Sequence, residues 1–223
     1  MGQTTSLSNK VLMDVARTHV ILVSGKRGSG KSFSLGVMAE EMINLPKDIS
    51  NNLSILMFDT MGIFWTMKYP NIRDQDLLEE WNLKPKGMDI NFFVPSGFFN
   101  EYRNKGLPAD IKFEIKTSEL SAGDWCEVFN IKITDSIGVF IERSLDELRL
   151  EKREDYDLLD IIEKIKKDKK VLQEVKDATE NRFVNASRWG LFSNKGTEIK
   201  DILRRGEVSV LDLSVILPMQ ATL

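Results

Sequence analysis

Three short apolar runs along the chain predict buried β-strands. They are His19 to Ser24 (HVILVS), Leu53 to Phe58 (LSILMF) and the run VSVLDLSVIL that follows Gly206. Each has the length and the β-branched or large apolar composition that are typical of strands. Between the first two runs, apolar residues recur at helical spacing until Pro46, where a helix has to end. A strand, a helix and a second strand form a βαβ unit, which predicts an α/β fold with a mainly parallel sheet.

The pattern loosens over residues 63–119. Prolines interrupt this segment, and only two short runs in it have strand character, Ile90 to Val94 and Ile111 to Ile115. We interpret the segment as an insertion on the sheet.

Residues 120–190 predict a helical subregion. Apolar stripes at helical spacing lie among many charged residues, which is typical of surface helices with one buried face. Ser121 and Asp124 have the spacing of a capping box at the start of one of these helices. The expected domains are an N-terminal extension, residues 1–18, and a core, residues 19–223.

Composition excludes several classes of protein. The 223 residues include 31 Lys and Arg against 34 Asp and Glu, a net charge of -3, so no overall basic field attracts a polyanion. One cysteine and one histidine exclude an internal disulfide framework and a multi-histidine metal site, and a cytoplasmic location is expected. No uncharged apolar run has membrane-spanning length, so no membrane partner is expected. The basic cluster Lys164 to Lys170 is interpreted as a solvated helix end, with a DNA contact as the alternative.

A complete phosphate-binding motif follows the first predicted strand. Gly25 to Ser32, GKRGSGKS, satisfies the Walker A pattern G-x-x-x-x-G-K-[S/T] between a strand and a helix, where its mechanism requires it. The glycines let backbone N–H groups approach the phosphates at a helix N-terminus. Lys31 is expected to bridge the β- and γ-phosphates of a bound nucleotide, and Ser32 to offer its hydroxyl to Mg²⁺. The candidate cofactor-binding residues are Gly25, Lys26, Arg27, Gly28, Ser29, Gly30, Lys31, Ser32 and Phe33; for Lys26 and Arg27 the alternative is an exposed loop charge.

Two acids end predicted strands, where open α/β sheets bind ligands. Asp59 follows LSILMF and Asp212 ends VSVLD. Each is a candidate magnesium-side acid, and Asp59 joins Lys31 as a candidate catalytic residue; the alternative for both acids is turn formation. Neither acid is followed by the glutamate that usually polarises the attacking water.

Five segments in order resemble the HerA-like ATPases of the HerA/FtsK superfamily, especially the archaeal members. The segments read HVILVSGKRGSGKSFSLGVMAEEM, ILMFDTMGIFW, DWCEVFNI, RFVNASRWGLF and LRRGEVSVLDLS, and with them the likeness extends over nearly all of residues 19 to 214. The resemblance implies a P-loop NTPase fold, a hexameric ring, ATP-driven movement along double-stranded DNA, and a nuclease or repair partner. It also implies that Asp212-Leu213-Ser214 precedes the Asp-Glu Walker B strand of the family. We therefore expect the core to be incomplete at its C-terminus, and 18 residues ahead of the first strand are too few for the family's N-terminal β-barrel.

Three functions are compatible with these features. The first is the ATP-binding core of a HerA-like DNA-translocating ATPase or helicase, a hydrolase if a longer chain supplies the Walker B strand. The second is a P-loop phosphotransferase acting on a small molecule, with Asp212 as its magnesium acid and residues 63–119 as its acceptor site. The third is an interaction subunit that binds ATP without hydrolysing it.

Overall fold

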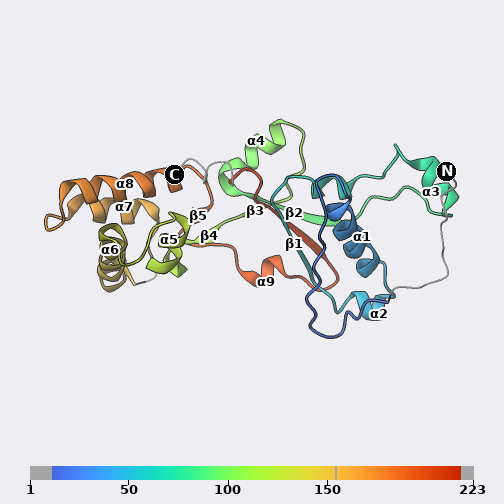
Figure 1. Cartoon of the computed structure of the whole chain (residues 1–223), viewed down its shortest axis with the longest axis horizontal. Helices are drawn as coiled ribbons and strands as arrows, with labels where there is room; N and C mark the ends of the chain where they lie inside the picture. Colours follow the sequence, from blue (N-terminus) through green and yellow to red (C-terminus); the bar gives the residue numbers. More distant parts are fainter. Residues whose placement is uncertain (1–11, 154, 217–223) are drawn as a thin grey trace.

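The computed structural model describes residues 12–153 and 155–216 and contains a four-stranded, fully parallel sheet (Figure 1). The strand order is β1-β6-β2-β3. The strands are β1 (Ile55–Asp59), β6 (Val208–Asp212), β2 (Ile90–Pro95) and β3 (Ile111–Phe113). The expected α/β fold with a mainly parallel sheet is therefore confirmed.

Strand β6 lies inside this sheet and is buried along its whole length. All five of its residues are buried, and it pairs with β1 on one side and β2 on the other. A strand that is buried on both faces has a nearly continuous apolar sequence, and for this reason β6 could be predicted from the sequence. Its register with β1 aligns Asp59 with Asp212 at the carboxyl ends of the two strands.

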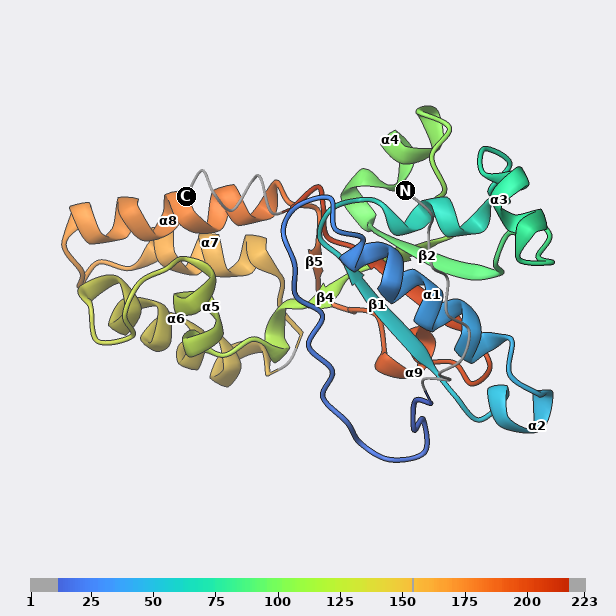
Figure 2. The ribbon, with the colours of Figure 1, turned by 45° about the vertical axis from the view of Figure 1, so that its right-hand side comes forward.

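Helix α1 (Lys31–Ile43) covers one face of the sheet. Ala39, Met42 and Ile43 pack into a core cluster with apolar residues of β1, β2 and β6. The chain then turns through α2 (Lys47–Ser50) into β1, so α1 and β1 run in opposite directions side by side (Figure 2). The N-terminus of α1 consequently lies at the end of the sheet where β1 and β6 finish.

The prediction of a strand at residues 19–24 is wrong, and it is the main difference between the predicted and the observed fold. Residues 19–24 are not a strand in the structure, and Val20 and Leu22 are 97% and 89% exposed. A strand exists only where a neighbouring strand completes its hydrogen-bond ladder. Within the described residues no strand pairs with residues 19–24. In particular β1, the strand that a βαβ unit would place in the same sheet, pairs only with β6. The apolar pattern of residues 19–24 indicates a tendency to be buried. It does not indicate whether a second strand is present to pair with them.

Residues 63–119 are built into the sheet, because they supply β2 and β3. The expected strand from Ile111 to Ile115 is divided at Glu114, whose backbone N–H donates to the Thr197 hydroxyl at 2.9 Å. Before Glu114 the chain pairs with β2, and after it with β5. The other elements of the segment are η1 (Phe64–Lys68), α3 (Gln75–Glu80), η2 (Ser96–Phe98), α4 (Phe99–Asn104), β4 (Ile115–Lys116) and η3 (Thr117–Glu119).

The helical subregion extends away from the sheet (Figure 1). Its core is aromatic, since Trp125 stacks on Phe129 and lies against Phe183 with ring centroids 5.5 and 5.0 Å apart. The predicted capping box of Ser121 and Asp124 is present. The helices are α5 (Ala122–Val128), α6 (Ser136–Lys152), α7 (Leu158–Lys167) and α8 (Gln173–Ser187), followed by β5 (Phe192–Ser193) and α9 (Ile199–Ile202).

The domain boundaries at residues 18, 63, 119, 120 and 190 remain predictions, and residues 1–11 of the expected extension lie outside the described residues. Among the helices that the structure describes, none has the length and apolar character needed to cross a bilayer.

Candidate nucleotide-binding site

The Walker A loop has the backbone shape that its glycines predict. Gly28 and Gly30 have φ angles of 81° and 86°, in the left-handed region that disfavours residues with a Cβ. Gly25 lies against Ser29, because a Cβ at this position would collide with the Ser29 hydroxyl oxygen, which would then have to rotate away. The loop therefore depends on glycine for its conformation at residues 28 and 30.

Lys31 lies across this loop. Its Nζ donates hydrogen bonds to the carbonyl oxygens of Gly25 at 2.7 Å and Lys26 at 3.0 Å. The ammonium group is thus held against the backbone of the loop that would surround a phosphate. Lys26 and Arg27 are exposed and form no ion pair within the described part of the chain, so their charges remain available to an anion.

The N-terminus of α1 is open to an anion. Its N-cap residue, Gly30, provides no side-chain cap, and the first turn contains no acidic residue. The first N–H groups of a helix have no partner within the helix, and its dipole adds partial positive charge there. The 13-residue helix α1 therefore presents unneutralised donors beside Lys31, and Ser32 and the 74% exposed Phe33 belong to the same turn.

Asp59 is buried, and its carboxylate is fully occupied by the turn that follows β1. Oδ1 accepts from the backbone N–H groups of Met61 and Gly62 at 3.1 and 2.8 Å. Oδ2 accepts from those of Ile63 and Phe64, both at 2.8 Å. A carboxylate has about four acceptor positions. Asp59 therefore shapes this turn, in line with the alternative of turn formation that its sequence context allows.

Asp212 is equally buried but has fewer partners. Oδ1 accepts from the backbone N–H of Ser214 at 2.8 Å, and Oδ2 accepts from the hydroxyl of Tyr102 at 2.6 Å. Burial and the hydrogen bond to Asp212 raise the pKa of Tyr102 well above its usual range, so the hydroxyl stays a donor. About two acceptor positions of Asp212 remain without a donor among the described residues.

The loop and the acids lie at the same end of the sheet. A Cβ built on Gly36, near the middle of α1, would lie 3.7 Å from the sulfur of Met67, so α1 packs against η1, which follows Asp59. No hydrogen bond joins Asp59 or Asp212 to the Walker A loop within the described residues. Tyr102 was not found by sequence reasoning, because it lies 110 positions from Asp212 and nothing in its own segment, FFNEYRN, signals the contact.

The comparison with protein families agrees with this arrangement. The family model described as "Helicase HerA, central domain" matches residues 2–222. The chain belongs to this family. With the parallel sheet and the Walker A loop, membership makes the chain an ATPase-type core. A search of curated proteins returns no match to it.

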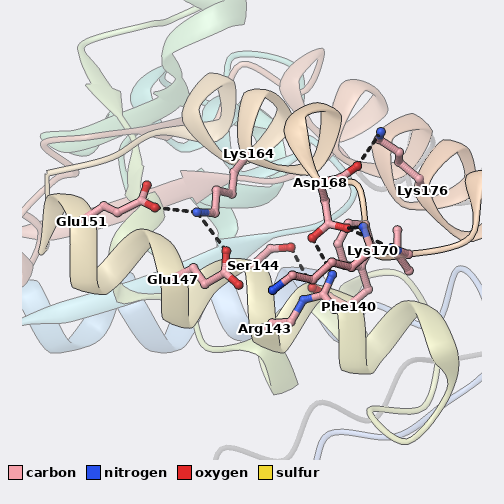
Figure 3. A network of polar contacts seen from close by, with 10 residues as sticks. Phe140, Arg143, Ser144, Glu147, Glu151, Lys164, Asp168, Lys170 and Lys176 are labelled. Carbon is pink, nitrogen blue, oxygen red and sulfur yellow. Dashed lines mark hydrogen bonds and ion pairs between the residues drawn. The ribbon is translucent and has the colours of Figure 1, made fainter.

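The basic cluster of this HerA-family core is largely neutralised by its neighbours. Figure 3 shows Lys164 between Glu147 and Glu151, with N–O distances of 2.9 and 2.6 Å. Asp168 pairs with Arg143 at 2.6 Å, and its backbone carbonyl accepts from Lys176. Lys164 thus joins α7 to α6, and Lys166, whose Nζ lies 3.2 Å from a carboxylate oxygen of Glu180, joins α7 to α8, which supports the interpretation of the cluster as a solvated helix end.

Proposed function

We propose that the chain is the ATP-binding core of a HerA-like, DNA-translocating ATPase. The observation that carries the proposal is the complete Walker A loop at the uncapped N-terminus of α1, at the carboxyl end of a parallel sheet. This end of an open α/β sheet is where ligands bind. The loop amides would hold the phosphates, Lys31 would neutralise the transferred charge, and Lys26 and Arg27 would add positive charge at the rim.

The residues at this end of the sheet also fit the magnesium ion that accompanies ATP. Mg²⁺ prefers oxygen ligands and is usually bound through one or two protein groups together with phosphates and water. Ser32 offers a hydroxyl in the first turn of α1, and Asp212 offers a carboxylate with acceptor positions to spare. When bound, the ion would stabilise charge on the phosphate oxygens. Asp59 supports the site indirectly, through the turn that it holds beside α1.

The proposed partners follow from family membership. They are double-stranded DNA, further copies of the chain in a hexameric ring, and a nuclease or repair protein, in the cytoplasm. A net charge of -3 is compatible with DNA held by a few residues of a ring, whereas a monomeric DNA clamp needs a broadly basic surface.

Replacement of Lys31 tests the proposal. Lys31→Ala should weaken ATP binding about tenfold or more, because a charge-assisted hydrogen bond to phosphate is lost. The thermal midpoint should hardly change, since among the residues that the structure describes the side chain bonds only to exposed loop carbonyls. Binding is measured by titration calorimetry. Lys195→Ala is the matched control, because Lys195 is exposed and its side chain has no hydrogen bond or ion pair to another described residue.

Unchanged ATP affinity in Lys31→Ala would overturn the proposal. Turnover measured with and without duplex DNA then separates the three functions. Stimulation by DNA supports the translocating ATPase, stimulation by a small-molecule pool supports a phosphotransferase, and tight binding without turnover supports the interaction subunit.

A further inference from the structure

Phe33 is an exposed aromatic residue in the first turn of α1, directly after the Walker A motif. Its side chain is 74% exposed, and among the described residues it belongs to neither of the apolar core clusters. Single exposed apolar residues are common on protein surfaces, so exposure alone does not assign a role to this ring. Its position beside the loop that would bind phosphate does.

The backbone of Phe33 belongs to the group of open donors at the start of α1. The backbone N–H of Ser34 donates to the carbonyl of Gly30 at 2.9 Å, so it is already satisfied within this turn. The N–H groups of Lys31, Ser32 and Phe33 precede it and have no backbone acceptor among the described residues. A phosphate that accepts from these donors would therefore lie within one helical turn of the Phe33 ring.

The direction of the Phe33 side chain follows from helix geometry. Side chains of an α-helix lean toward its N-terminus, and the Cα of Phe33 lies only about 3 Å further along the axis than that of Lys31. The ring therefore flanks the open end of α1, where the phosphates would lie. In a nucleotide, one ribose joins the phosphates to the base, so the base has to lie just outside the phosphate site. Aromatic side chains stack on bases because both have flat π-faces.

We propose that Phe33 is the residue on which the base of the bound nucleotide stacks. The inference rests on the proposed function and deepens it, because it divides recognition of the nucleotide within one turn. The amides and Lys31 hold the phosphates, and the Phe33 ring holds the base. Every base has a π-face, so Phe33 adds affinity for nucleotides without selecting among the bases. Since one stacked base adds little affinity by itself, adenosine without phosphates remains a weak ligand.

The experiment compares the affinities for ATP and for tripolyphosphate, both measured by titration calorimetry with Mg²⁺. Tripolyphosphate has a chain of three phosphates like that of ATP but lacks the base, so the ratio of the two affinities reports the base. Phe33→Ala should reduce the affinity for ATP about tenfold and leave the affinity for tripolyphosphate unchanged. Phe33→Tyr keeps an aromatic ring and should retain the wild-type ratio.

Phe58→Ala is the matched control, because Phe58 is a second exposed phenylalanine, near the end of β1. Its neighbour Met57 packs in the same core cluster as α1, so Phe58 lies on the opposite face of the sheet. Phe58→Ala should leave the ratio unchanged. Circular dichroism establishes that each variant is folded. If Phe33→Ala does not fold, Phe33→Leu decides, because leucine favours helices and has no π-face, and it should lower the ratio as well.

The outcomes separate this inference from the proposed function. If the wild-type chain binds neither ATP nor tripolyphosphate, both fail. If it binds both ligands and Phe33→Ala leaves the ratio unchanged, whether by no loss or by an equal loss for the two, the stacking role is overturned and the proposed function stands. A ratio in Phe33→Tyr as low as in Phe33→Ala, or an equal drop in Phe58→Ala, overturns the stacking role as well.

Discussion

At the scale of single residues, chemically similar side chains do different work in this protein. Asp59 and Asp212 occupy equivalent positions in adjacent strands, yet among the described residues Asp59 accepts from four backbone N–H groups and Asp212 from one tyrosine and one backbone N–H. The sequence places both acids correctly at strand ends. It does not reveal their difference, because the donors come from the fold: Tyr102 is brought to Asp212 only by the packing of α4.

The turn after β1 gives a prediction at this scale. Asp59→Ala should lower the free energy of unfolding by about 3 kcal/mol, because it leaves four N–H groups without their acceptor. Urea denaturation measures the change. Asp76→Ala, which removes an exposed acid in α3, should stay within about 0.5 kcal/mol of the wild type. Equal effects of the two substitutions would contradict the structural role of Asp59.

At the scale of elements, apolar patterns predict helices more reliably than strands. The apolar stripe Leu158, Ile161, Ile162 and Ile165 is fully buried in α7, and the run VSVLD is the buried strand β6. Helix periodicity is local, so one segment is enough to recognise it. The run HVILVS has an equally strong pattern, but a strand also needs a neighbour, and the neighbour's position is a property of the whole sheet.

The start of α7 gives the prediction at this scale. Asp157 accepts from the backbone N–H groups of Leu159 and Asp160, and the Asp160 side chain accepts from the backbone N–H of Asp157. Asp157→Ala should therefore destabilise the chain by about 1 kcal/mol, the usual cost of losing an N-cap. Glu127→Ala, at an exposed helix position, is the control. A midpoint of urea unfolding that is unchanged in Asp157→Ala would show that the capping box contributes nothing.

At the scale of the whole molecule, two features were predicted from the sequence and one was not. The parallel sheet and the separate group of helices both follow from the order of patterns along the chain. The sequence predicts the two strands of residues 63–119 but not their place in that sheet, since crossovers place β6, from the far end of the chain, between β1 and β2. This topology is what brings α4, the turn after β1 and the end of β6 to one place.

The most direct test of the account is competition for the Walker A loop of the wild-type chain. A fluorescent ATP analogue is bound in the presence of Mg²⁺ and then titrated with ATP, pyrophosphate or adenosine. Since the loop amides and Lys31 recognise phosphate, the account predicts saturable binding that ATP and pyrophosphate displace and adenosine does not. Displacement by adenosine but not by pyrophosphate, or no saturable binding at all, would contradict it.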